Sequence, residues 1–270
     1  HRTKPQLAAE MVQRIASWLP NYKLHVVGDV AYVGQCLLKN RADNVELLGP
    51  VRWDAALTTP LSRSAKKGRK RGDRLPTPRA ILNGNDPRWC VEKIRLIYPR
   101  GEKELEVKVV RDVCWYHLAG PRPLMIVLVH DPEGKWREEA LISTDTTLTA
   151  EQVVAGYCRR WSVEVAYADS KGSLGLHDPE VWCEKSVQRA HPMSWYVGSL
   201  VILWYALFGR DEPAPQRHRP WYTHKPEVTF ADMLASCRYH LWQNWLAKSA
   251  SRAELEERSA WLLEYLATAA

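Results

Sequence analysis

The sequence predicts an α/β fold, because segments with helical periodicity alternate with short apolar strands on either side of a β-rich stretch. Residues 5–52 follow the order helix, strand, helix, strand. Apolar runs separated by turn residues fill the region from 92 to 144, and long helical patterns begin at about 150. We therefore divide the chain into four parts: an α/β part over residues 1–48, a β-rich part over 49–140, a second α/β part over 141–210 and a helical region over 211–270.

The first part begins with an amphipathic helix over residues 5–19. Leu7, Met11, Ile15 and Leu19 recur at helical spacing, and Pro5 suits a first helical turn. The run "KLHVVGD" then predicts a short strand that ends in a turn. "VGQCLLKNRA" predicts a second helix, and "VELLGPVR" predicts the next strand.

The β-rich part contains three strand candidates, "EKIRLIYP", "ELEVKVVRDVCWYHL" and "PLMIVLVHD", and "DPEG" forms a hairpin into "KWREEALIST". After it, Thr149 and Gln152 resemble a capping box that opens a helix over about 150–171, and Gly172 fits its end. A long apolar helix over 188–209 and two further helices over 229–246 and 251–269 close the chain.

Composition restricts the function classes. Apolar residues make up 46% of the 270 residues, which is enough for a buried core and argues against disorder. The net charge of +7 favours a polyanionic partner, although basic proteins without one are common. Six scattered cysteines without a C-x-x-C pair argue against a zinc site and a disulfide framework, and they suit a reducing cytosol. The apolar run over 197–209 is short for a bilayer, so we expect a buried helix and no membrane partner.

A basic segment lies at the start of the β-rich part. Residues 62–79 hold eight Lys and Arg against one acid. The segment could be a solvated linker, or it could contact a DNA backbone, where clustered cations displace condensed counterions. The candidate DNA-binding residues at its centre are Lys67, Arg69, Lys70 and Arg71.

A second polar pattern lies in the helix predicted over 150–171. Tyr157, Arg160, Glu164 and Lys171 would share an arc about 60° wide on a continuous helix. One interpretation is a solvated face with an ion pair between Arg160 and Glu164. The other is a site in which Glu164 holds a metal and its neighbours grip phosphates.

A second carboxylate could complete such a metal site. Asp29 follows the first predicted strand, and strand ends of open α/β sheets line ligand crevices. An Asp after a strand is also a common turn residue. If Asp29 and Glu164 come together, they could hold Mg²⁺. Asp145 is interpreted as a turn or pre-helix residue.

These residues carry a resemblance to a known family. Tyr157, Arg160, Glu164 and Lys171 match Y-x2-R-x3-E-x6-K, and "DVAY" from Asp29 is similar to a second segment of the same group. The chain resembles bacterial insertion-sequence transposases of the DDE superfamily.

The resemblance implies a ribonuclease H-like fold over 1–48 and 141–210, interrupted by a β-rich insertion over 49–140. It implies Asp29 and Glu164 as catalytic, metal-binding acids with Mg²⁺ or Mn²⁺, and Tyr157, Arg160 and Lys171 as contacts to DNA phosphates.

The resemblance also implies partners and a setting. The partners are double-stranded DNA at transposon ends and target, and a second copy of the chain in a synaptic complex, in the bacterial cytoplasm near the nucleoid. Some relatives hold a flipped base with an aromatic residue, for which Trp136 and Trp115 are candidates, although core or hairpin packing fits either residue.

One departure from the family pattern affects the expected activity. The family's first catalytic Asp would lie on a strand before the helix at 5–19, and no residue here fills that role. We therefore expect a C-terminal portion that cleaves DNA poorly by itself and acts as a transposase in full-length form. The alternatives are a non-catalytic DNA-binding remnant that regulates transposition, or an unrelated basic protein.

Overall fold

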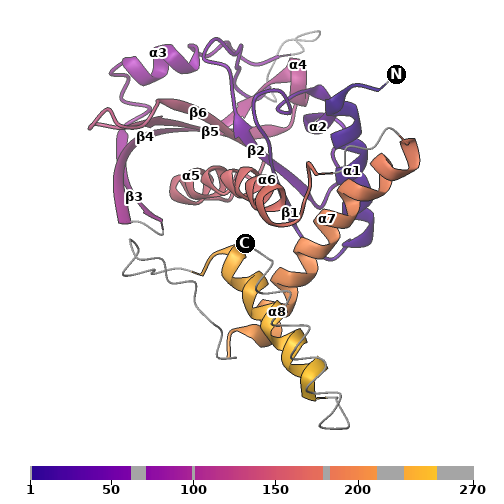
Figure 1. The fold of residues 1–270 in the computed structure, drawn as a ribbon. Coiled ribbons are helices and arrows are strands. Elements are labelled where there is room, and N and C mark those ends of the chain that lie inside the picture. Colours follow the sequence, from indigo (N-terminus) through magenta and orange to yellow (C-terminus); the bar gives the residue numbers. More distant parts are fainter. Residues whose placement is uncertain (1, 62–70, 99–100, 179–182, 212–227, 248–270) are drawn as a thin grey trace. The chain divides into compact units, whose positions relative to one another are not determined.

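The structure is a computed structural model that describes residues 2–61, 71–98, 101–178, 183–211 and 228–247 (Figure 1). The chain divides into two compact units, residues 1–161 and 162–270, and each is described by itself. The basic residues Lys67, Arg69 and Lys70 and the helix predicted over 251–269 lie outside the described residues.

The first unit is a mixed α/β fold built on a six-stranded sheet with the order β1-β2-β6-β5-β4-β3. Strands β1 and β2 are parallel, and the other neighbours in the sheet are antiparallel. The predicted strands are present in one continuous sheet, except that the candidate over 104–118 ends at Cys114 and its last residues begin a short helix. Their bounds are β1 Leu24–Val27, β2 Val45–Pro50, β3 Val91–Tyr98, β4 Gly101–Cys114, β5 Pro123–His130 and β6 Glu139–Ser143.

Helices cover both faces of this sheet (Figure 1). The central strand β5 shows why: Ile126 and Leu128 pack on one face, whereas Met125 and Val127 pack on the other. Its run of apolar residues therefore reflects burial on both sides. The helices of this unit are α1 Lys4–Trp18, α2 Gln35–Leu38, α3 Pro78–Asn83, α4 Tyr116–Ala119 and α5 Ala150–Cys158.

Helix α5 begins as the sequence predicts. The Thr149 hydroxyl accepts a hydrogen bond from the Gln152 backbone N–H at 3.2 Å, and the Gln152 side chain accepts one from the Thr149 N–H at 2.9 Å. The two residues form the expected capping box, which satisfies two backbone donors at the start of the helix.

The single helix predicted over 150–171 is wrong. Helix α5 ends at Cys158, and a separate helix, α6, runs from Trp161 to Ser173. The Arg160 N–H donates to the Tyr157 carbonyl at 3.0 Å, an i to i+3 bond that tightens the last turn of α5. The regular rotation of about 100° per residue is interrupted there, so the four motif residues do not share one continuous helix.

The second unit is helical in its described part. It contains α6, α7 Glu184–Trp204, the π-helical turn Tyr205–Gly209 and α8 Phe230–Ala247. The prediction that Gly172 ends the helix is wrong, because α6 continues to Ser173. Among the described glycines of this unit, Gly175 has the positive φ that is common after a helix end.

Helix α7 differs from the buried helix that the sequence predicts. Its buried residues are Gly198 and Val201, whereas Met193, Tyr196 and Leu203 are exposed. Among the described residues, one helical stretch, Glu184–Gly209, is long and apolar enough to cross a membrane by length and composition. It is longer than the apolar run noted in the sequence because the helix already starts at Glu184. A single stretch of this kind is weak evidence for a membrane span, and only 11% of its apolar window is buried inside the structure.

Candidate functional site

Asp29 lies where the chain turns at the carboxyl end of β1. Its carboxylate oxygen Oδ1 accepts the Ala31 N–H at 2.7 Å, and its backbone carbonyl accepts the N–H groups of Tyr32 and Val33. The residue is exposed, and no described residue forms a hydrogen bond to Oδ2. Asp29 thus has the role of a turn residue and still presents an open carboxylate oxygen.

Gly49 allows this turn to pack against β2. A β-carbon at Gly49 would lie 2.5 Å from Val33 Cγ2 and 2.7 Å from the Gly28 carbonyl oxygen. Both distances are shorter than any van der Waals contact, so only glycine fits here. Sequence reasoning missed Gly49, which lies in the neighbouring strand β2.

Tyr157 reaches the same region from α5. Val153 and Val154 bury one side of this helix against the sheet, and Tyr157 packs against the edge of the same cluster. A β-carbon at Gly156 would lie 2.7 Å from Leu48 Cδ2, so the glycine lets α5 approach β2 closely. Close packing of α5 thus places Tyr157 beside the carboxyl ends of β1 and β2.

The Tyr157 phenol lies in a charged environment. Burial raises the pKa of Tyr157, and the negative charges of Glu139 and Asp29 raise it further. The Arg160 guanidinium opposes this shift in the pKa, and its central carbon lies 5.9 Å from the centre of the Tyr157 ring. Of the residues singled out in the sequence, Tyr157 therefore has Arg160 beside it and feels the charge of Asp29.

Glu139 is a member of this group that sequence reasoning missed. It begins β6, and burial raises its pKa, whereas the charges of Arg137 and Arg160 lower it. The sequence signal would have been a carboxylate opening a strand whose other residues are apolar. The adjacent Glu138 makes that signal ambiguous, because strand register decides which carboxylate faces α5.

Glu164 and Lys171 lie on α6, in the second unit. They are seven residues apart, so they project about 20° apart around the helix axis. Glu164 is half-buried and Lys171 is exposed.

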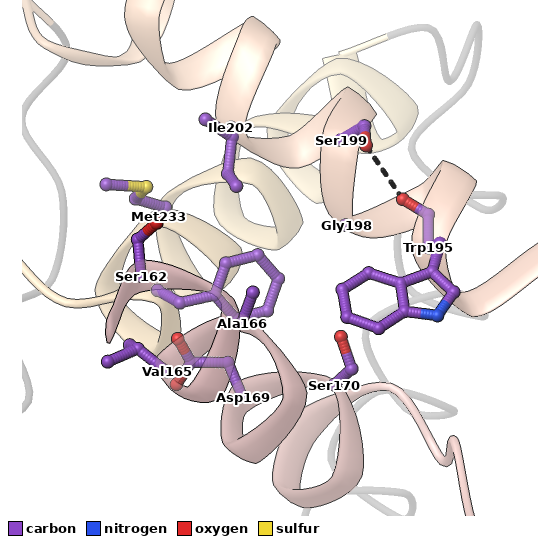
Figure 2. A pocket seen from close by; sticks show the side chains of 11 residues that line it. Ser162, Val165, Ala166, Asp169, Ser170, Trp195, Gly198, Ser199, Ile202 and Met233 are labelled. Carbon is purple, nitrogen blue, oxygen red and sulfur yellow. Dashed lines mark hydrogen bonds between the residues drawn. The ribbon is translucent and has the colours of Figure 1, made fainter. Parts of the chain in front are cut away.

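The opposite side of α6 lines an apolar pocket of about 330 Å³ within the second unit (Figure 2). Burial raises the pKa of Asp169, the carboxylate on its wall, and the Trp195 indole lies across from it. The α6 residues that line the pocket project at least about 100° away from Glu164 around the helix axis, so the pocket is separate from the motif side of the helix. These residues are Ser162, Val165, Ala166, Asp169 and Ser170.

The two aromatic candidates differ in their surroundings. Trp115 is buried in the core, in agreement with a packing role. Trp136 is 37% exposed in the loop between β5 and β6. The backbone N–H of Trp136 donates to Asp131 Oδ2 at 2.8 Å, and Asp131 Oδ1 also pairs with Lys103 Nζ at 2.9 Å. The loop that carries Trp136 is therefore held by a buried carboxylate.

Arg71 is the described member of the predicted basic cluster, and it lies exposed in a bend.

Asp145 lies near the amino end of β1, whereas Asp29 follows the carboxyl end of the same strand. Its Oδ2 contacts Lys23 Nζ at 2.5 Å and His25 Nε2 at 3.1 Å. Its Oδ1 accepts the Thr147 N–H, as in the pre-helix turn that the sequence predicts.

Comparison of the sequence with protein families and with curated proteins gives no relative from which the site could be interpreted. No protein-family model matches the chain, and no curated protein matches it. A functional assignment therefore depends on the residues themselves and on the motif spacing.

Proposed function

We propose that the chain is the C-terminal portion of a DDE-type transposase. Such an enzyme catalyses metal-dependent phosphodiester hydrolysis and strand transfer at insertion-sequence ends. The observation that supports the proposal is that Tyr157 lies beside Arg160 and near enough to Asp29 for the Asp29 charge to raise the pKa of the phenol. The two motif matches arose from segments far apart in the sequence, and nothing in their spacing required them to approach each other.

A ribonuclease H-like core is the finer fold proposed within the mixed α/β architecture. Its support is the parallel pair β1 and β2, the helix between them and the Asp at the carboxyl end of β1. In open α/β sheets, ligands bind outside the carboxyl ends of the strands.

The residues of the site have distinct roles in this proposal. Asp29 and Glu164 would be the carboxylate ligands of Mg²⁺ or Mn²⁺. The open Oδ2 of Asp29 suits a hard cation, whereas among the described residues no three His, Cys, Asp or Glu side chains form a ready metal group. When bound, the cation would activate a water or 3′-hydroxyl nucleophile and stabilise the leaving oxygen. Arg160 and Lys171 would grip phosphates, and Tyr157 would orient Arg160.

Double-stranded DNA is the proposed partner, and a synaptic homodimer in the bacterial cytoplasm is the proposed assembly. The net charge of +7 supports a polyanionic partner. Arg71 and Trp136, both exposed, would add DNA contacts outside the carboxylate site. The same would hold for Lys67, Arg69 and Lys70 of the basic segment.

DNA binding by the purified chain is the first test. A fluorescent duplex is titrated at several salt concentrations with the native chain and with Arg160→Ala and Lys171→Ala. Each substitution should weaken binding and reduce the slope of log K against log salt by about one. Lys93→Ala is the matched control, because this exposed lysine lies on β3 and pairs with Glu104. Affinity that is insensitive to salt and to both substitutions would refute a DNA-binding site here.

Cleavage is the second test, measured on the full-length gene product with Mg²⁺ or Mn²⁺. Glu164→Gln should abolish cleavage and leave DNA binding mostly intact, whereas Glu151→Gln, an exposed change on α5, should not affect cleavage. Cleavage retained by Glu164→Gln would show that Glu164 is not a metal ligand. Salt-sensitive DNA binding without cleavage in the native protein would favour the non-catalytic regulator instead.

A further inference from the structure

The pocket of the second unit is built by three helices, on the side of α6 that faces away from Glu164 (Figure 2). Helix α6 contributes Val165 and Ala166, α7 contributes Ile202, and α8 contributes Met233. The volume of about 330 Å³ falls within the range of small-molecule sites, which runs from roughly 300 to 1,000 Å³. A cavity of this size with apolar walls suits an organic ligand.

Asp169 brings a charge into this pocket. It is the one charged side chain among the described residues that line the pocket, and it shares the α6 wall with Val165 and Ala166 (Figure 2). Burial raises the pKa of its carboxyl group, and no described residue forms a hydrogen bond or an ion pair with the carboxylate. The Ser199 hydroxyl is already used, because it donates to the Trp195 carbonyl at 2.9 Å. An unpaired carboxylate among apolar side chains is complementary to a ligand that brings a cation.

Trp195 forms an aromatic wall of the pocket across from Asp169 (Figure 2). Tyr167, two residues before Asp169 on α6, packs edge-to-face on this indole, with ring centroids 4.7 Å apart and ring planes at 85°. This contact between α6 and α7 holds the indole in one orientation. Phe230, which is 8% exposed, adds a second ring from α8. Two rings on the walls favour a ligand that contains a ring, because aromatic pairs gain stabilisation beyond the area that they bury.

The same features disfavour other classes of ligand. An anion would be repelled by the Asp169 carboxylate. A magnesium or calcium ion would find one carboxylate in the pocket, whereas either ion takes about six or more oxygen ligands. A neutral apolar molecule would fit the walls but would leave the carboxylate desolvated and without a partner.

We propose that this pocket binds a small organic cation, namely an amine with an aromatic body. The ammonium group of the ligand pairs with Asp169, and its ring lies against Trp195, Phe230 and Met233. The inference is independent of the proposed transposase function, because it uses no residue assigned to DNA or to the metal.

Methionine methyl NMR of the full chain tests the proposal with two probes of similar shape, phenethylamine and phenethyl alcohol. The chain has four methionines, and Met233 lines the pocket, whereas Met11, Met125 and Met193 do not. Met233→Leu assigns the signal. The amine should shift the Met233 signal to saturation, with an affinity about tenfold higher than that of the alcohol, since a charged partner strengthens the hydrogen bond to the carboxylate. The signals of the other three methionines should not move.

Asp169→Asn then tests the source of the selectivity. This substitution should lower the affinity for the amine to that for the alcohol and leave the affinity for the alcohol nearly unchanged. Glu184→Gln is the matched control, because it removes an exposed carboxylate of the same unit at the start of α7 and should preserve the preference for the amine.

Three outcomes would overturn the inference. They are a Met233 signal that neither probe shifts, equal affinities of the native chain for the two probes, and equal losses of amine affinity in Asp169→Asn and Glu184→Gln. A chain that binds the amine through Asp169 but does not bind DNA would support the inference and refute the proposed function alone.

Discussion

Asp145→Asn should destabilise the first unit, because Asp145 joins the start of β1 to the start of α5. The side chain is 4% exposed and contacts Lys23, His25 and Thr147. Burial alone would raise its pKa, but hydrogen bonds from Lys23 and Thr147 outweigh burial and lower the pKa from 3.8 to about 2. That difference corresponds to about 2 kcal/mol of stability at neutral pH. Asparagine would lose this contribution and would direct an N–H donor at the Lys23 ammonium.

The pH dependence has a definite sign. Because the folded-state pKa is depressed, the stabilisation is fully present above pH 4 and is lost as the pH falls towards 2. Native protein and Asp145→Asn should therefore differ by about 2 kcal/mol in unfolding free energy at pH 7, and the difference should shrink in acid.

Urea unfolding at several pH values measures this difference. Hydrogen exchange of peptides covering residues 23–29 and 145–158 localises it to β1 and α5. Asp54→Asn is the control, because the Arg52–Asp54 pair is exposed and its loss should not be measurable. Equal stability of native protein and Asp145→Asn at pH 7, or a difference that persists unchanged at pH 2, would refute the reasoning.

Two further substitutions test packing around the site. Gly49→Ala should destabilise the first unit by about 1–3 kcal/mol, because its β-carbon would collide with the Gly28 backbone. Gly156→Ala should lower the free energy of unfolding by less than Gly49→Ala does, because its clash is with a movable Leu48 methyl group and alanine favours the helix. Equal losses of thermal stability in the two variants would contradict this ranking. A third substitution tests a buried polar contact. Lys108→Met should lower the free energy of unfolding by about 2–4 kcal/mol, because the buried Lys108 ammonium donates to three backbone carbonyls at the end of α3. Lys93→Met, on the exposed side of β3, should have little effect in the same urea titration.

The amino-acid sequence by itself determined the local elements of this protein. The alternating and continuous apolar runs predicted the strands, and Thr149 with Gln152 predicted the start of α5. These features depend on residues within one or two turns of one another, so propensity, patterning and capping suffice to predict them. The motif residues were also found from spacing alone, together with the expectation that Asp29 would lie at a strand end.

Only the tertiary structure decided which of these residues meet. The interruption after Cys158 places Tyr157 and Glu164 on two different helices, although their spacing fits one helix. The register of β6 decides that Glu139, and not Glu138, lies on the face of the sheet that α5 covers. Register, close approach and burial depend on pairs of residues far apart in the chain. The spacing of residues in the sequence therefore identifies the candidate residues, and the packing of strands and helices determines which of them lie close together.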